Sequence, residues 1–446
     1  MTDLSRLTDA LLDAAKRAGA DAADALAISG TSVSIDIRAG KLEQAERSEG
    51  IEIGLRVLIG GQQACVSASD ISEATIRALA ERAVAMAKEA PSDPYAGLAD
   101  PEQIARTWDL AALEMCDPAP EPGAAALEQS ARDVEQAALA TAGITQVEAS
   151  AAYSARQMHL AATNGFSGGY ARTSHSLSAV AFTGSGTQME RDWAAEGRTY
   201  GEDMPGATGI GTLAAERALQ RAGAVKPRTG TYPVLFDERV ASSLIGHLLS
   251  ATNGAAIARG ASWLRDALGT LVLPATLSII EDPHRPRISA SRPFDGEGLP
   301  TRRRVIVENG ILTGWTLDLA TGRKLGMPST ANGARGTSSP PSPATSNIDL
   351  SPGTLTRDDL IAQMGTGLLV TSMIGSTISS TTGDYSRGAA GFWVENGVIS
   401  HPVNECTIAG NLRDMLLRVI PANDARAHLS TRVPSLLIEG MTIAGA

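Results

Sequence analysis

The chain has few aromatic residues, few cysteines and no long apolar run. Aromatic residues make up 4% of its 446 residues, so few ring surfaces are available for stacking nucleic-acid bases. The cysteines Cys65, Cys116 and Cys406 are far apart and odd in number, which excludes a disulfide framework and a four-thiolate zinc site. No apolar run reaches the roughly 18 to 20 residues that a membrane-spanning helix needs, so we expect no membrane association.

Basic residues are fewer than acidic residues, with 38 lysines and arginines against 49 aspartates and glutamates. The formal net charge is -11, and the densest basic cluster is the "TRRR" of residues 301–304. A negative chain repels phosphate backbones, so nucleic acid is not expected as a partner. The N-terminus "MTDLSRLTDALLDAAKRAG" carries acids where a signal peptide needs a basic start, and we therefore expect a cytoplasmic protein.

The length and the residue patterns predict a multi-domain α+β fold. A helix over about 3–18 precedes the alternating stretches "SVSIDIRAG" and "IEIGLRVLIGG", which predict an antiparallel sheet. Asp70 is placed to cap a second helix over 71–90, and further helices are expected near 124–142 and 212–223. The predicted units are an N-terminal α+β domain, a middle β-rich domain with helices, and a large β-rich C-terminal domain, over 1–112, 113–225 and 226–446 respectively.

The C-terminal unit contains two similar hairpins and a long polar segment. Asn309-Gly310 and Asn396-Gly397 each follow Val-Glu and suit the two positive-φ positions of a type I′ turn. The segment 329–353 is small, polar and rich in proline. Loops of this length are uncommon unless they line a site, so it is either the wall or lid of a cleft or a disordered tether.

A single histidine, His247, lies in the expected helix "ERVASSLIGHLLSA", which Asp237 caps. Helical spacing places His247 on one stripe with Val240, Leu244 and Ala251, which predicts a core position. Zinc takes three or four N, S or O donors, and the positions one turn away offer only serine, threonine, leucine and alanine. We therefore predict no metal site at His247.

Other apparent motifs are incomplete. In "HPVNEC", His401 and Glu405 share a strand face roughly 13 Å apart and Cys406 points the other way, which disfavours local zinc binding. "GFSGG" matches a nucleophile elbow at Ser167, but a strand pattern follows where a helix is required. "GIGTLA" at 209–214 lacks the preceding strand of a dinucleotide-binding motif. The residues alone give no complete catalytic set.

Several long phrases resemble the TldD/PmbA family, formerly called modulators of DNA gyrase. They are "ATNGFSGGYARTSHSLS", "FDGEGLPTRRRVIVENGILTGWTLD", "NGARG" before "SNIDLSPG", and "GDYSRGAAGFWVENGVI" with "IAGNL" after it. The zinc-bearing TldD kind of subunit carries H-E-x-x-x-H on a helix. The corresponding positions here are Ile245, Gly246 and Ser250, so the chain resembles the TldE (PmbA) kind, which has no zinc motif.

This resemblance implies the non-zinc subunit of a cytoplasmic heterodimeric metalloprotease that processes peptides and unfolded small proteins. It implies no catalytic residue and no cofactor in this chain, with zinc and the catalytic carboxylate supplied by a TldD-type partner. Homodimerisation remains possible in isolation. By family phrase and polarity, the candidate substrate-cleft residues are Asp295, Glu297, Asn332, Arg335, Asp384 and Arg387.

Two other functions stay open at this point. One is a self-sufficient peptidase or hydrolase that uses Ser167 or a metal site assembled from distant residues. The other is a peptide-binding protein without catalysis.

Overall fold

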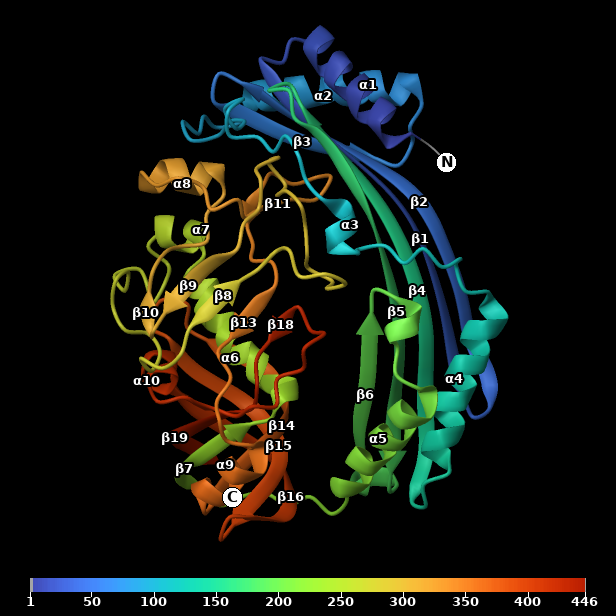
Figure 1. The fold of residues 1–446 in the computed structure, drawn as a ribbon, viewed down its shortest axis with the longest axis vertical. Coiled ribbons are helices and arrows are strands. Elements are labelled where there is room, and N and C mark those ends of the chain that lie inside the picture. Colours follow the sequence, from blue (N-terminus) through green and yellow to red (C-terminus); the bar gives the residue numbers. More distant parts are fainter. Residues whose placement is uncertain (1–2, 446) are drawn as a thin grey trace.

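The computed structural model describes residues 3–445, which form a long curved sheet and a C-terminal domain held on its concave side (Figure 1). The sheet has six strands in the order β3-β2-β1-β4-β5-β6, and every neighbouring pair is antiparallel. Its strands are β1 (Ala22–Arg38), β2 (Lys41–Ile59), β3 (Gln62–Ala68), β4 (Ile144–Ala162), β5 (Ser167–Thr183) and β6 (Glu190–Arg198).

The first two predicted units share this sheet. Strand β1 pairs with β4 from Asp24 opposite Ala162 to Arg38 opposite Glu148, which joins the strands of both units into one hydrogen-bonded ladder. The segment between β3 and β4 contains α2, the short α3 (Leu110–Leu113) and α4. The structure therefore differs from two separate N-terminal bodies, although the pattern of helices and strands in each is the expected one.

Four helices cover the outer face of the sheet: α1 (Leu4–Ala18), α2 (Glu73–Glu89), α4 (Ala124–Leu139) and α5 (Ala207–Gln220). Alternation in the strands explains this cover, because one parity of β1 residues packs under α1 and α2 at one end and under α4 at the other. Two details differ from expectation. Ser72, rather than Asp70, is the N-cap of α2, and α5 begins at Ala207. The Asp70 side chain instead accepts hydrogen bonds from Ser72 and Thr75.

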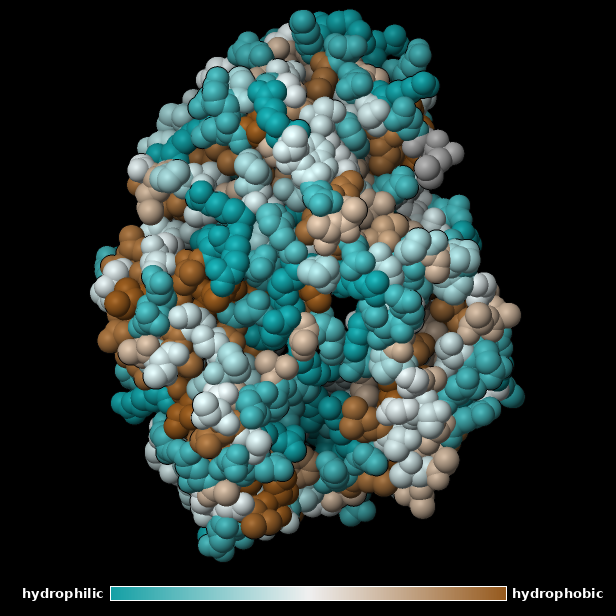
Figure 2. All heavy atoms as spheres, in the orientation of Figure 1, coloured by the Kyte–Doolittle hydropathy of each residue, from teal (hydrophilic) through white to brown (hydrophobic). Residues whose placement is uncertain are grey.

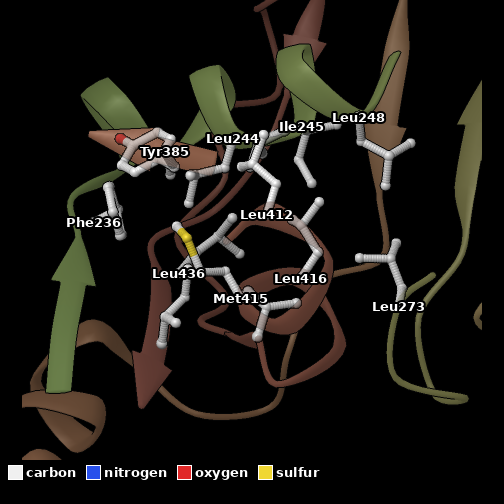
Figure 3. Close-up of a cluster of buried hydrophobic side chains, with 14 of the residues drawn as sticks. Phe236, Leu244, Ile245, Leu248, Leu273, Tyr385, Leu412, Met415, Leu416 and Leu436 are labelled. Carbon is white, nitrogen blue, oxygen red and sulfur yellow. The ribbon is translucent and has the colours of Figure 1, made fainter. Parts of the chain in front are cut away.

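The C-terminal domain contains a sheet that closes on itself. Strands follow the order β16-β15-β14-β7-β19-β17, and an additional β16–β19 pairing closes the ring. The strands are β7 (Gly230–Phe236), β14 (Gly367–Ile378), β15 (Asp384–Glu395), β16 (Val398–Asn411), β17 (Ile420–Pro421) and β19 (Leu436–Ala444). Within this sheet, β7 and β14 run parallel and the other neighbouring pairs are antiparallel. The large apolar core of the domain fills this ring and continues under α6 (Glu238–Ala251) (Figure 3).

A second, five-stranded sheet has the order β10-β9-β8-β13-β18. Its strands are β8 (Ile279–Glu281), β9 (Arg304–Glu308), β10 (Ile311–Leu312), β13 (Ile348–Leu350) and β18 (Thr431–Arg432). The remaining helices of the domain are α7 (Gly254–Ala258), α8 (Leu319–Leu325), α9 (Arg357–Met364) and α10 (Leu412–Leu417). Asn309 and Asn396 have φ values of 49° and 51°, as the predicted hairpin turns require.

The polar segment 329–353 is ordered and packs against the long sheet. It contains the short pair β11 (Gly333–Ala334) and β12 (Ser342–Pro343). A Cβ at Gly54 of β2 would lie 2.2 Å from the carbonyl oxygen of Thr337, so the loop backbone approaches the sheet where only glycine fits. The Thr337 hydroxyl also donates to Glu52. This segment joins the two parts of the molecule rather than forming a tether.

Among the helices of residues 3–445, none combines the length and the apolarity that crossing a membrane requires.

Candidate functional site

Helix α6 carries Ile245, Gly246 and Ser250, the positions at which the family resemblance predicts that the zinc motif is replaced. Asp237 caps it by accepting a hydrogen bond from the Arg239 amide, as the sequence predicts. Ile245 is fully buried and points from α6 into the core towards Leu412 and Leu416 of α10 (Figure 3). Gly246 is half-buried and Ser250 is exposed, so these two positions have different surroundings from Ile245.

Gly246 and Ser250 border a pocket of about 390 Å³ beside α6. Its lining consists mainly of small and hydroxyl-bearing residues: Ser242, Ser243, Gly246, Leu249, Ser250, Asn253, Thr316, Pro343, Ala344, Thr345 and Thr431. A Cβ at Gly246 would meet nothing within 4 Å, so the pocket leaves open space over the middle of the helix. Hydroxyl and amide groups can hydrogen-bond to a peptide, but none of them can replace an imidazole, thiolate or carboxylate as a zinc ligand.

His247 does not complete a metal site. Its ring lies 6.0 Å from the ring of Tyr385, and no hydrogen-bond partner of its Nε2 atom is found among residues 3–445. Burial, followed by the positive charge of Arg387, lowers the pKa of His247. The described part of the chain holds no group of three or more histidine, cysteine, aspartate or glutamate side chains placed to hold a metal. The residues present therefore do not fit a zinc ion.

The histidine, glutamate and cysteine of "HPVNEC" face different surroundings. His401 contacts the Ser400 hydroxyl at 3.1 Å, and Glu405 is exposed and pairs with Lys226. Cys406 is buried in the core, where desolvation raises its pKa to about 11. These three side chains therefore do not converge on one point where a metal ion could bind.

Ser167 lies close to a histidine, but the pair lacks the third group of a catalytic triad. Its Oγ atom is 3.4 Å from Nε2 of His159, while the other ring nitrogen of His159 is 2.9 Å from the hydroxyl of Thr8. A triad places a carboxylate at this third position, where it stabilises the imidazolium that forms during attack. Ser167 begins strand β5 after a turn with Gly165 at φ 95°, as the sequence indicates. The arrangement does not favour a serine nucleophile.

Three of the six candidate cleft residues meet in one buried cluster, which we call the upper junction: Asp295, Glu297 and Arg335, together with Asp24, Arg56 and Asp318. Asp24 and Arg56 come from the long sheet and the other members from the C-terminal domain. Arg56 Nε donates to Asp24 at 2.8 Å, and Arg335 pairs with the same carboxylate. These side chains connect the two parts of the molecule, and a direct role in substrate contact stays a prediction.

Backbone amides hold the acids of the upper junction in place. Asp295 accepts hydrogen bonds from the amides of Glu297, Leu299 and Gly333, each at 2.9 Å. Glu297 accepts one from the Leu319 amide at 2.8 Å. Burial raises the pKa of Asp295, and burial followed by the charge of Asp295 raises the pKa of Glu297 well above its ordinary value.

Asn332 is buried outside the upper junction, and its side-chain amide donates to Glu281 at 2.8 Å. Asp384 and Arg387 lie elsewhere, on strand β15. Asp384 is exposed and accepts hydrogen bonds from Thr382 and Asn411, which lower its pKa. Arg387 donates to the Gly375 carbonyl at 2.8 Å. Both are bonded within the C-terminal domain, so the structure does not bring them to the upper junction.

The sequence reasoning missed a large cleft between the long sheet and the closed sheet. In space-filling view the molecule is hollowed between its two parts (Figure 2). One pocket in this region, of about 830 Å³, has residues of β5 and β6 on one side and residues of β14, β15 and β16 on the other. Val180, Phe182 and Trp193 face it from the inner side of the long sheet. In the sequence these large apolar residues alternate with alanines that are buried in the structure, which could have indicated a second apolar face of the sheet. The alternation does not show that the closed sheet lies opposite that face.

Comparison with protein families gives three successive matches along the chain. Residues 23–87 match PmbA/TldA metallopeptidase domain 1, residues 117–222 the central domain and residues 229–445 the C-terminal domain. The metalloprotease PmbA of Escherichia coli O157:H7 is 36% identical over 95% of this chain and 92% of its own length. The chain belongs to the PmbA/TldD family. A PmbA homolog of Haemophilus influenzae is also 36% identical, over 99% of this chain and 96% of its own.

Solved structures of the PmbA/TldD family share the fold. A protein of Bacteroides thetaiotaomicron described as a putative modulator of DNA gyrase superposes with a TM-score of 0.91 at 27% identity, covering 99% of this chain and 98% of its own. TldE of Thermococcus kodakarensis superposes with a TM-score of 0.85 at 18% identity, over 98% of this chain and 100% of its own. Family membership and the α+β fold are thereby confirmed, whereas the predicted domain boundaries stay predictions.

Proposed function

We propose that this chain is the non-zinc subunit of a cytoplasmic, heterodimeric PmbA/TldD-family metalloprotease acting on peptides and unfolded small proteins. In this proposal a TldD-type paralogue supplies the zinc ion and the carboxylate that moves the proton, and the present chain helps to enclose the substrate. The TldD-type partner, the placement of zinc in that partner and the cytoplasmic location are all parts of this proposal.

The observation that carries the proposal is the chemistry of helix α6. The motif positions hold Ile245, Gly246 and Ser250, with the first in the core and the other two beside an open, hydroxyl-lined pocket. Peptide hydrolysis at zinc requires a metal-activated water and a base. A family member that retains the fold but offers neither group on this helix is suited to binding substrate while its partner performs the chemistry.

The test is reconstitution with the TldD-type paralogue from the same organism. Each chain is assayed alone and mixed in equal amounts against an unstructured casein, with metal content measured for each. We expect proteolysis only in the mixture and bound zinc only in the paralogue. Proteolysis by this chain alone, or roughly stoichiometric zinc in it, would contradict the proposal.

Two variants distinguish a loss of substrate access from a loss of pairing between the two subunits. Gly246→Leu fills the space over α6 and is expected to reduce proteolysis by the mixture while both chains still co-elute in size-exclusion chromatography. Gly206→Ala serves as the control, because a Cβ there also meets nothing within 4 Å and it lies at the start of α5. Unchanged proteolysis by the mixture that contains Gly246→Leu would show that the α6 pocket is not part of the proposed substrate cleft.

A further inference from the structure

A pocket at the lower end of the contact between the two parts of the molecule has no role in the proposed function. It has a volume of about 520 Å³ and lies between α5, the start of α6, α9 and the strands β14 to β16. We call the charged residues around it the lower junction: the ion-paired Asp192, Asp237, Arg239 and Arg357, together with Arg217. The Asp192–Arg239 pair joins β6 to the C-terminal domain, and the upper junction joins β1 and β2 to that domain near the other end of the long sheet (Figure 1).

Every carboxylate of the lower junction is already paired with an arginine. Arg239 lies between Asp237, at 2.9 Å, and Asp192, at 3.2 Å. Arg357 contacts the second oxygen of Asp237 at 3.2 Å. Glu238, also in the pocket lining, pairs with Arg426 at 2.9 Å. The acids therefore present no uncompensated negative charge to a ligand, apart from the exposed Glu216 at the rim.

Arg217 differs from the other arginines of the pocket. It donates one hydrogen bond, from Nη1 to the Trp193 carbonyl at 3.0 Å, and no carboxylate within 4.0 Å is found among residues 3–445. Burial, followed by the charge of Arg239, lowers its pKa. A half-buried guanidinium has five N–H donors, and a planar anion can accept two of them at once. An anionic group would thus supply the charge that this side chain lacks.

A second polar group in the pocket lacks a partner. Thr371 is 6% exposed, lines the pocket, and has no hydrogen-bond partner for its Oγ1 atom within the described part of the chain. It lies at a β-bulge, because its neighbours Val370 and Ser372 pair with the adjacent residues Gly391 and Ala390. Thr371 follows Leu369 by two residues on β14, so strand alternation places both side chains on the pocket side, where the Thr371 hydroxyl lies beside Leu369 and Phe392.

We propose that this pocket binds a carboxylate carried next to an apolar group, with Arg217 as the ion-pairing residue and the Thr371 hydroxyl as a further donor. Leu213, Leu369, Phe392 and Ile399 line the same pocket and would contact the apolar group. This combination suits the C-terminal residue of a peptide and equally a small branched organic acid. The inference concerns the isolated chain and does not require the heterodimer.

Isothermal titration of the full chain with matched ligands tests the assignment. The ligands are an acetylated tripeptide of two alanines and a C-terminal leucine, its C-terminal amide, the same peptide ending in glycine, and isocaproate. We expect the free acid to bind about tenfold or more tightly than the amide, since charge-assisted bonds to arginine are lost in the amide. Peptide binding tighter than isocaproate binding identifies a peptide C-terminus as the source, and the reverse order identifies a small acid.

Variants locate the site independently of the ligand series. Arg217→Gln is expected to abolish the preference for acid over amide, and Thr371→Val to weaken acid binding about threefold. Arg82→Gln, at an exposed position of α2, should change neither. Equal binding of acid and amide to the unaltered chain, absence of binding at millimolar concentration, or an unchanged preference in folded Arg217→Gln would each overturn the proposal. The acid and amide comparison decides the matter even if a variant fails to fold.

Discussion

The upper and lower junctions connect the same two parts of the molecule with arginine and carboxylate side chains, yet their surroundings differ. In the upper junction Asp24, Arg56 and Asp295 are each no more than 3% exposed, and main-chain amides or arginines satisfy the acids. In the lower junction the charged residues border a pocket of about 520 Å³, and Arg217 is partly exposed, with no acidic side chain within 4.0 Å among residues 3–445. Arginine side chains that are fully buried and paired with acids therefore stabilise the fold, whereas an arginine that borders a pocket without such a pair remains available to a ligand.

The largest effect on stability is expected from breaking the upper junction. Arg56→Met leaves the buried Asp24 carboxylate with only Arg335 and removes positive charge from beside Glu297. Removing one partner of a buried ion pair costs about 3 to 5 kcal/mol, and urea unfolding followed by circular dichroism measures the loss. The control is Arg82→Gln, which should leave the unfolding midpoint unchanged. A similar midpoint for both variants would show that the upper junction does not stabilise the fold.

A smaller loss is expected from separating the loop 329–353 from the long sheet. Gly54→Ala places a methyl group 2.2 Å from the Thr337 oxygen, so the backbone must shift. Overpacking of this kind costs about 1 to 3 kcal/mol. Gly50→Ala on the same strand is the matched control, because its Cβ meets nothing within 4 Å. The difference in melting temperature between the two variants reports the loop contact, and equal values would contradict a tight approach.

The upper junction also predicts a pH dependence. The folded-state pKa of Glu297 lies well above its ordinary value of 4.5, so above that pH the folded protein holds a proton that the unfolded chain has released. The free energy of unfolding therefore falls as pH rises from 4.5 towards the folded pKa. Buried Asp295 shifts in the same direction. Glu297→Gln removes the contribution of Glu297, so its stability relative to the unaltered protein should increase between pH 4.5 and about pH 7.

Urea unfolding at both pH values measures this change, with Glu216→Gln, at an exposed position of α5, as the control. A relative stability of Glu297→Gln that decreases over this interval would reverse the sign and contradict the argument.

The smallest effect on stability is expected at Arg217. Its guanidinium donates to one carbonyl and has no carboxylate neighbour among the described residues, so Arg217→Gln should change the free energy of unfolding by no more than about 1 kcal/mol. Thermal unfolding monitored by calorimetry checks this value. A loss as large as that of Arg56→Met would mean that the two junctions serve the same structural purpose.

Sequence reasoning succeeded where the signal was local. The Asp237 cap, the core positions of Leu244 and Ala251, and the turns at Asn309 and Asn396 depend on neighbours a few residues away. The family resemblance is also confirmed by the comparisons, whereas the replacement of the zinc motif on α6 stays a prediction. These features fix the class of fold and the place where the candidate site is sought.

Long-range placement could not be predicted in the same way. Nothing near Asp24 indicates that its partner Arg335 lies far along the chain, or that polar residues in the loop "NGARG" become buried. Arg217 occupies a helix position that resembles an ordinary surface cation, and the sequence around Thr371 does not show that a pocket faces its side of β14. Burial and pairing of these residues depend on the contact between two bodies, which a linear pattern does not encode.

The continuous ladder between β1 and β4 has a consequence for dissecting this protein. The segment 90–123 that connects the two N-terminal family domains contains only the short helix α3 and lies outside the ladder. A single cleavage there would leave both fragments bound along the whole length of their shared strands, so a nicked molecule should still elute as one particle. Conversely, a fragment that ends before β4 would carry an exposed strand edge, which makes it prone to self-association rather than an independent module.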